Sequence, residues 1–217
     1  MSLTHEKDSL IIEMLENANH IAVVPSKIAG TDAFAASAGI YLALKDAEKN
    51  VSFLYPGRIP DGCETLIDKD TIVDNIKMRE LVISVDYSET PATKVQYSTD
   101  DDILRLVLST VGNNFTLANV NTELKGFDFD TIITVGVREF EDLGQTYREL
   151  EKEFRASKLI NIDNTSMNTK FGTVDVVDTM EENLSLLVLN SMPKWGLRIN
   201  SKSVGALLKG VEYRKLS

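Results

Sequence analysis

The stretch LINIDNTSMNTKFG, residues 159–172, carries the clearest fold signal in the chain. Its apolar start (Leu159, Ile160, Ile162) is typical of a buried β-strand, and the strand pattern ends at Asp163. In α/β proteins, polar residues that follow a buried strand lie at the carboxyl edge of the sheet, where ligands bind. We therefore predict a candidate site at this edge. The alternative, an Asx turn in which the carboxylate only stabilises the loop, stays open.

The same alternation of apolar strands and amphipathic helices extends on both sides of this stretch. A strand, a loop, a helix and a second strand follow one another within residues 21–55, which predicts a βαβ unit with a right-handed parallel crossover. We expect an α/β fold with a mostly parallel, doubly wound sheet. Strands are expected at residues 21–24, 51–55, 131–135, 158–162 and 174–177, and helices at 6–18, 32–49, within 61–76, 141–156, 181–192 and 203–210.

Residues 79–125 have a different pattern. Short runs at 81–85, 94–97, 103–108 and 115–118 alternate apolar and polar residues, as antiparallel strands with one wet face do. We predict an antiparallel β-meander inserted into a single domain that spans residues 1–217. The acidic triplet at 100–102 is interpreted as a solvated hairpin turn that guards against edge pairing.

Composition and charge narrow the function classes. The net charge of −10 argues against duplex nucleic acid as a partner, since that binding needs a Lys/Arg surface. No apolar run reaches the ~18 residues of a membrane span, so no membrane partner is expected. The single cysteine, Cys63, excludes an internal disulfide and favours a cytoplasmic protein. No histidine lies near Cys63 in the sequence, so we interpret it as a bystander.

Three segments, in this order, resemble the DHH phosphoesterase family. They are HIAVVPSKIAGTDAFAASAGIYLALKDAEKNVSFLYP (20–56), FDTIITVGVREFEDLGQTYRELEKEF (129–154) and LINIDNTSMNTKFGTVDVVD (159–178). The resemblance is to the N-terminal domain of the branch that includes oligoribonuclease/nucleotide phosphatases and exopolyphosphatases. It implies the fold expected above, and a smaller C-terminal substrate-binding domain that is absent from this sequence.

The resemblance also implies a pair of Mn²⁺-type ions held by carboxylates and imidazoles. Most of those ligands are replaced here, and only Asp32 and Asp163 keep the family's carboxylates. Two carboxylates offer at most a weak Mg²⁺ or Mn²⁺ site and do not make a dinuclear centre. We therefore expect no cofactor and no intact catalytic residues. The substituted family positions are Ser26, Gly30, Gly136, Asn164 and Thr165, with one more near Arg214.

Two polar loops remain as a predicted metal-free ligand site. The first precedes a helix, whose N-terminal N–H groups and dipole attract anions, and the second supplies neutral donors. Asp32 has an alternative role as the cap of its own helix, and both loops have the alternative of being solvated turns. The candidate residues are Ser26, Gly30, Thr31 and Asp32 in the first loop, and Asp163, Asn164, Thr165 and Asn168 in the second.

Three functional hypotheses follow. The first is a phosphoesterase-like protein, catalytically impaired, that binds a nucleotide or another small phosphorylated ligand. The second is an active metal-dependent phosphoesterase acting on a nucleotide, oligonucleotide or polyphosphate through Asp32 and Asp163. The third is a non-catalytic interaction module that works through the inserted strands and predicts a homo-oligomer or a partner complex.

Overall fold

The computed structural model describes residues 3–88, 94–109 and 111–216. The chain forms two compact units, Met1–Met78 with Phe127–Ser217, and Arg79–Gly126. The larger unit contains a six-stranded parallel sheet of order β10-β9-β8-β1-β2-β3, so the α/β prediction is confirmed. Its strands are β1 (Ile21–Pro25), β2 (Val51–Leu54), β3 (Ile72–Val73), β8 (Thr131–Val135), β9 (Lys158–Asp163) and β10 (Val174–Val177).

Strand order places a topological switch point between β1 and β8. From β1 the chain crosses through α2 (Gly30–Asp46) to β2 on one side. From β8 it crosses through α3 (Gln145–Glu149) and α4 (Glu151–Ala156) to β9 on the other side. Ligands of doubly wound sheets bind at the carboxyl ends of the strands beside such a point. The loops after β1, β8 and β9 are therefore the ones that can form a site.

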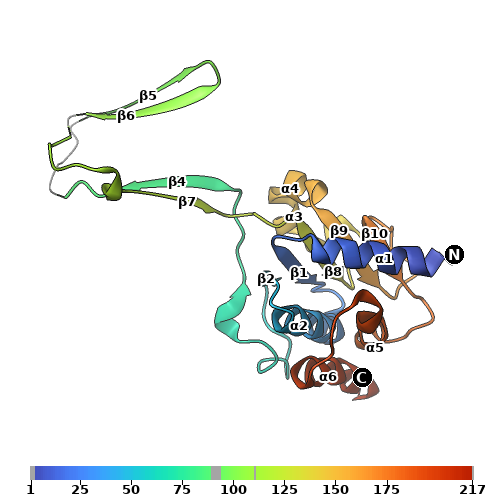
Figure 1. The fold of residues 1–217 in the computed structure, drawn as a ribbon. Coiled ribbons are helices and arrows are strands. Elements are labelled where there is room, and N and C mark those ends of the chain that lie inside the picture. The colour runs from blue at the N-terminus through green and yellow to red at the C-terminus, as the bar shows by residue number, and fades with distance from the viewer. Residues whose placement is uncertain (1–2, 89–93, 110, 217) are drawn as a thin grey trace. The chain divides into compact units, whose positions relative to one another are not determined.

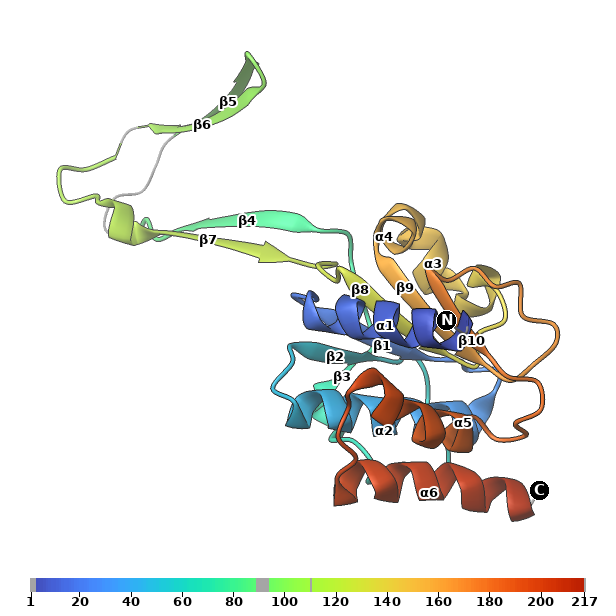
Figure 2. The same ribbon diagram turned by 45° about the vertical axis from the view of Figure 1, so that its right-hand side comes forward.

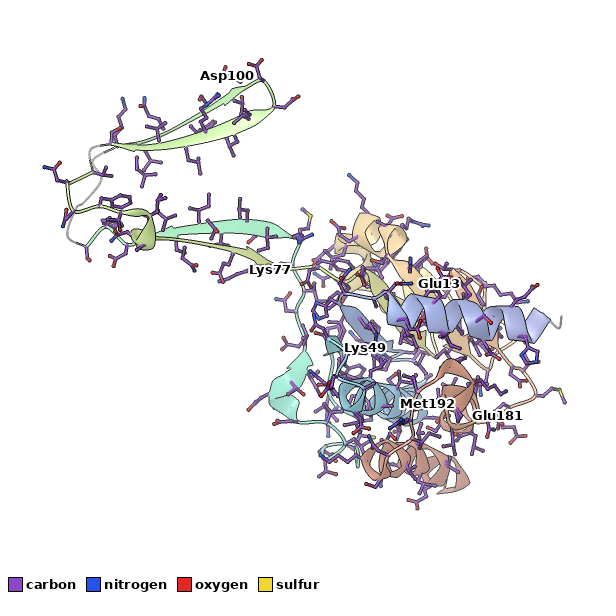
Figure 3. The ribbon with its side chains drawn as sticks, viewed as in Figure 1. Glu13, Lys49, Lys77, Asp100, Glu181 and Met192 are labelled. Carbon is purple, nitrogen blue, oxygen red and sulfur yellow. The ribbon has the colours of Figure 1, made fainter. Side chains whose placement is uncertain are left out.

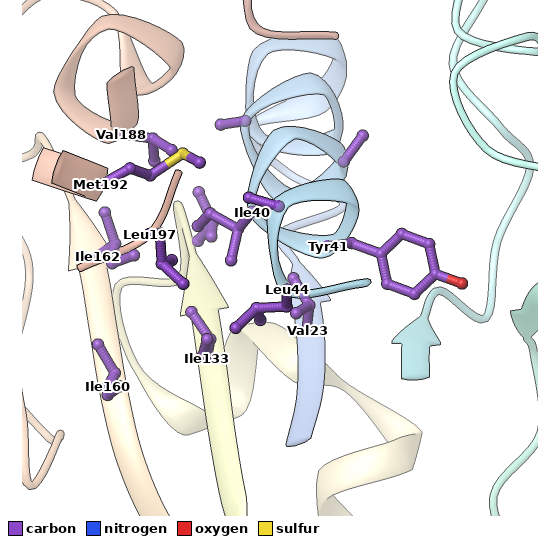
Figure 4. Packing of buried hydrophobic residues seen from close by; sticks show 14 of the residues in the cluster. Val23, Ile40, Tyr41, Leu44, Ile133, Ile160, Ile162, Val188, Met192 and Leu197 are labelled. Atoms are coloured by element: carbon purple, nitrogen blue, oxygen red, sulfur yellow. The ribbon is translucent and has the colours of Figure 1, made fainter. Parts of the chain in front are cut away.

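Helices cover both faces of the sheet, which makes it doubly wound (Figures 1 and 2). An apolar core lies on each face. The larger core packs α1 (Leu3–Glu16), α2, α5 (Leu184–Ser191) and α6 (Ser201–Leu216) against one face. In Figure 4, strand residues such as Val23 and Ile133 meet Ile40 and Leu44 of α2. The other core packs α3 and α4 against Ala22, Val24 and Ile132, and alternate residues along the strands thus face opposite cores.

The structure corrects two predicted helices. The helix expected within residues 61–76 is replaced by a 3₁₀ turn, η1 (Lys69–Thr71), and by β3, because this segment pairs with β2 at the sheet edge. The helix expected at 141–156 is divided into η3 (Phe140–Leu143), α3 and α4. The breaks fall at Gly144, with a φ of +66°, and at Leu150, whose φ and ψ of −126° and 27° are not helical.

The smaller unit is antiparallel as predicted, but its strands do not form a meander. The outer ladder pairs β4 (Glu80–Val85) with β7 (Val120–Lys125), and the inner ladder pairs β5 (Lys94–Asp100) with β6 (Ile103–Ser109). The strand expected at 115–118 is a loop and a 3₁₀ turn, η2 (Leu117–Asn119), and β7 follows it. The inner hairpin turns at Asp101 and Asp102, both with positive φ, beside Asp100, which is labelled in Figure 3.

The pairing is therefore nested, first strand with last and second with third. A turn with two residues of positive φ matches the twist of the strands it joins, which explains the tight inner hairpin. The remaining two strands then pair with each other as the outer ladder.

Candidate functional site

The loop after β9 is held by hydrogen bonds within the chain. The Asp163 side chain is buried: its Oδ1 accepts from the Asn164 backbone N–H at 2.8 Å, and its Oδ2 accepts from Asn168 Nδ2 at 2.8 Å. The Asn164 amide donates to the Glu181 carbonyl, and Thr165 Oγ1 accepts from the Met167 N–H. The carboxylate thus stabilises its own loop, as in the Asx-turn alternative.

Asn168 fixes the orientation of that carboxylate. Its Nδ2 also donates to the Val137 carbonyl at 2.9 Å, and its Oδ1 accepts from Asn161 Nδ2 at 2.9 Å and from the Lys170 N–H at 2.8 Å. An amide side chain has two N–H groups and two acceptor lone pairs, so the hydrogen-bonding capacity of Asn168 is filled. Asn161 is fully buried in β9 and accepts from the Thr134 hydroxyl of β8, which anchors the loop to the sheet.

Burial raises the pKa of the Asp163 carboxyl above its usual range, because desolvation disfavours the charged form. The hydrogen bonds from Asn168 and from the backbone of Asn164 and Thr165 act in the opposite direction, as does the charge of Arg138. The chain itself therefore supplies the partners of this carboxylate.

Asp32 stabilises a different helix from the one that contains it. Its Oδ2 accepts from the Leu184 N–H at 2.8 Å, and its Oδ1 accepts from the N–H and hydroxyl of Ser185 at 3.0 and 2.8 Å. These two N–H groups lie in the first turn of α5, which has no earlier carbonyl to bind them. The expected cap of α2 is wrong: α2 begins at Gly30, and its N-cap residue, Ala29, makes no side-chain cap.

The loop after β1 leaves the start of α2 facing a hollow. Ser26 is buried, and its Oγ accepts from the N–H groups of Ile28 and Ala29 at 3.2 Å, so these two donors are already bound. Gly30 has a φ of +63° and opens the helix without a side chain over it. The first-turn N–H groups of α2 therefore have no side-chain acceptor from the N-cap position.

We call this space the α2 hollow. Its volume is about 550 Å³. Lys27 and Arg58 contribute positive charge to its lining, and Arg58 Nη2 lies 2.9 Å from Asp61 Oδ1 in an exposed ion pair. Burial raises the pKa of Tyr55, which keeps this phenol protonated at neutral pH. The full lining is Lys27, Ile28, Ala29, Gly30, Thr31, Tyr55, Arg58, Ile59, Pro60, Asp61 and Tyr213.

The end of β8 has no room for a metal ligand. Gly136 occupies the position that the DHH resemblance assigns to a metal-binding aspartate, and its φ is +70°. A Cβ atom here would lie 2.9 Å from both the Ala29 Cβ and the Leu184 Cδ1. Such contacts are closer than carbon atoms approach in packed cores. Apolar packing thus fills the space beside this strand end.

The residues do not fit the dinuclear centre implied by the resemblance. Both oxygens of Asp32 and both oxygens of Asp163 accept hydrogen bonds from the chain. Within residues 3–88, 94–109 and 111–216, no three His, Cys, Asp or Glu side chains are grouped so that they would hold a metal ion.

The structure separates the predicted site residues into four groups. Gly30 and Thr31 line the α2 hollow, Ser26 closes the turn before it, and Asp32 is bound to α5. The four residues of the second loop bind one another and neighbouring backbone. Sequence reasoning missed Lys27, Arg58 and Tyr55. Lys27 and Arg58 follow strand ends, which is the signal that could have found them.

A polar cluster at the opposite end of the sheet contains His20. Its Nε2 is 2.9 Å from Ser52 Oγ, and its Nδ1 is 2.8 Å from Asp128 Oδ1. The order of residues is that of a Ser-His-Asp triad, but the described atoms give Nδ1 no hydrogen-bond partner, so the carboxylate is close without being aligned. A triad needs that hydrogen bond to hold the imidazole in one tautomer. We interpret the cluster as structural.

Comparisons with known proteins identify a shared fold. No family model matches the chain, and no curated protein matches its sequence. A solved structure, that of an exopolyphosphatase-related protein from Bacteroides fragilis, matches with a TM-score of 0.63 and 13% identity. The match covers 98% of this chain and 52% of that one, so the chain spans about half the length of that protein. At this identity the likeness shows the fold alone. No helix in the described part of the chain has the length and apolar character needed to cross a bilayer.

Proposed function

We propose that the chain is a degenerate member of the DHH phosphoesterase family that lacks two-metal hydrolysis and binds a small phosphorylated ligand. Three lines of support combine: the ordered motif segments, the fold shared with an exopolyphosphatase-related protein, and the packing of Gly136 against Ala29 and Leu184 where the family has a metal ligand. The lone cysteine fits a cytoplasmic location for this protein.

The single observation that carries the binding proposal is the uncapped start of α2 beside the α2 hollow. A phosphate group there would accept hydrogen bonds from the first-turn N–H groups and would gain from the helix dipole. Lys27 and Arg58 would add charge-assisted hydrogen bonds, and the guanidinium of Arg58 suits two phosphate oxygens at once. The ligand would have to displace Asp61 from Arg58, which favours ligands of high negative charge.

Thermal unfolding of the purified chain with nucleoside phosphates and with inorganic polyphosphate tests this proposal. A ligand at ~100 times its Kd stabilises the folded state by about 2.7 kcal/mol, which corresponds to a Tm increase of roughly 5–10 °C for a chain of this size. The increase should be smaller in Arg58→Gln and unchanged in Arg148→Gln, which removes an equal charge from α3, outside the hollow.

The metal dependence of the result separates the hypotheses. We expect the stabilisation to be the same with EDTA and with Mn²⁺. Mn²⁺-dependent hydrolysis of a phosphodiester to a phosphomonoester and an alcohol, or Mn²⁺-dependent release of phosphate from polyphosphate, would instead support the active enzyme if it is lost in Asp163→Ala. A Tm that no phosphorylated compound changes would contradict binding in the hollow.

A second candidate function, the interaction module, is favoured by a separate observation. Apolar side chains of the inserted unit are exposed on both of its ladders.

A further inference from the structure

The inner ladder has one face without charged residues and one mostly polar face, although Val107 and Ile103 on the mostly polar face are also exposed. Residues opposite each other in an antiparallel pair project to the same side, and the side alternates along the strand. Val95 is opposite Leu108, Tyr97 is opposite Leu106, and Thr99 is opposite Leu104. The other side carries Lys94, Gln96, Ser98, Asp100 and their partners Ser109, Val107, Arg105 and Ile103.

The outer ladder repeats this arrangement. Leu81 is opposite Leu124, Ile83 is opposite Thr122, and Val85 is opposite Val120. The other side carries Glu80, Val82, Ser84, Asn121, Glu123 and Lys125. The apolar sides of the two ladders, which we call the ladder faces, consist of Leu81, Ile83, Val85, Val120, Thr122 and Leu124 in one ladder and Val95, Tyr97, Thr99, Leu104, Leu106 and Leu108 in the other.

The apolar side chains of the ladder faces are more exposed to solvent than is usual for clustered apolar residues on a monomeric protein. Val95, Tyr97, Leu104 and Leu106 are 46–78% exposed, and Leu81, Ile83 and Leu124 are 40–62% exposed. The side chains project from two-stranded ribbons, as Figure 3 shows. An isolated two-stranded ladder is marginally stable in water and needs packing on its apolar face. Exposed apolar patches of this kind, one on each ladder, mark interaction sites.

The exposed area fits an interface of ordinary size. Fully burying a large aliphatic side chain contributes about 1.5–3 kcal/mol, at about 25 cal/mol per Å² of apolar surface. Each such side chain therefore removes about 60–120 Å² of apolar surface from water. At the exposures above, the two ladder faces offer roughly 400 Å² of apolar area. A standard interface buries about 800 Å² per partner, of which a little over half is apolar.

The charge of the ladders favours a second copy of the chain. The four strands contain three acidic residues (Glu80, Asp100, Glu123) and three basic residues (Lys94, Arg105, Lys125), so they are neutral within a chain of net charge −10. Two copies can therefore meet through the paired residues of the ladder faces, while the acidic turn residues Asp101 and Asp102 lie outside those pairs at the end of the inner ladder. The faces themselves carry no charged side chain that would select a partner of opposite sign.

We propose that a second copy of this chain covers the ladder faces, so that the protein is a homodimer held by its inserted unit. Contact between the same surface of two copies is the common two-fold arrangement of homodimers. The two layers would pack face to face at about 10 Å, as sheets do in sandwiches. A dimer formed through the ladder faces does not require a ligand in the α2 hollow.

Light scattering coupled to size-exclusion chromatography tests the proposal on the full chain. We expect twice the chain mass of 24.1 kDa at micromolar concentration. Tyr97→Lys and Ile83→Lys each place a charge on a ladder face and should reduce the mass to that of one chain. Their neighbours on the same strands, Ser98 and Ser84, project to the polar side, so Ser98→Lys and Ser84→Lys should remain dimers. Circular dichroism checks that all four variants are folded.

Hydrogen exchange of the wild-type chain provides the second measurement. Backbone amides of β4–β7 should be protected at concentrations where the dimer forms and should lose protection on dilution. A monomer whose ladders are protected would mean that the two faces cover each other within one chain and would overturn the proposal. A monomer with unprotected ladders, or a dimer that all four lysine variants leave intact, would overturn it as well.

Discussion

Replacing Asp32 by alanine tests the role that the structure gives this residue, the cap of α5. The change removes the acceptor of two backbone N–H groups, those of Leu184 and Ser185, and of the Ser185 hydroxyl. Hydrogen bonds to a charged group contribute about 1.5–3 kcal/mol each, whereas loss of an N-cap alone costs about 0.5–2 kcal/mol. Because the three bonds share one carboxylate, we expect a combined loss of about 3 kcal/mol in the free energy of unfolding.

Urea unfolding followed by tryptophan fluorescence measures this loss. The chain has one tryptophan, Trp195, and its buried side chain lies in η4 (Met192–Trp195), directly after α5. The midpoint should fall while the slope stays constant, because the same surface is exposed on unfolding. The corresponding fall in Tm is roughly 6–12 °C for a chain of this size. Asp32→Asn keeps one acceptor oxygen but sets an amide N–H against a backbone N–H of α5, so it should also lower the free energy of unfolding.

Ser37→Ala is the matched control on the same helix. The Ser37 hydroxyl is fully buried and has no hydrogen-bond partner among the described residues, so its removal should leave the free energy of unfolding unchanged or raise it. If Asp32→Ala loses no more than about 0.5 kcal/mol relative to this control, the capping argument is refuted. If Mn²⁺ stabilises the wild type and not Asp32→Ala, the residue is a metal ligand instead.

Four further outcomes are expected. Burial raises the pKa of the Cys63 thiol to about 11, so a thiol reagent at pH 8 should label this residue only after unfolding in urea. Asp163→Asn sets two amide N–H groups against each other and should cost about 1–3 kcal/mol in urea unfolding. Gly136→Asp, which restores the family carboxylate, combines a left-handed backbone with overpacking, so the Tm should fall and no Mn²⁺ binding should appear by calorimetry. The hydrogen bond from Arg138 lowers the pKa of Asp142 in the folded state. The pair therefore contributes its full stability above the unfolded-state pKa of about 3.9. This contribution is lost as the pH falls through the lower pKa of the folded state. The stability difference between wild type and Asp142→Asn should therefore shrink between about pH 4 and pH 2, and a difference independent of pH would contradict the assignment.

The parallel sheet was predictable because its central strands are buried on both faces. Continuous apolar runs such as Ile21–Val24 in β1 are typical of strands buried on both faces, and the spacing of the strands then favoured βα units. The edge strand β3 has two residues and carries no such signal. The division of the helix at 141–156 depends on the backbone angles of Gly144 and Leu150, which periodicity alone does not reveal.

The candidate site was predictable in location and much less in detail. Strand ends pointed to the loops that contain Gly30 and Asp163. The partner of Asp32 lies about 150 positions further along the chain, at Ser185, and such a contact leaves no local trace in the sequence. The same holds for Arg58, whose place in the α2 hollow follows from the path of the loop after β2.

The ends of the inserted unit have a consequence for the history and engineering of the fold. The Phe127 N–H donates to the Lys77 carbonyl at 2.9 Å, so the chain leaves and re-enters the larger unit at adjacent points. Because the two ends of the insert are already close together, inserts of different length can be accommodated here. The loop-closure entropy changes only slowly with the length of the insert. Relatives with the same sheet could therefore carry unrelated inserts at this position, and the site between Lys77 and Phe127 is a natural place to graft a foreign domain.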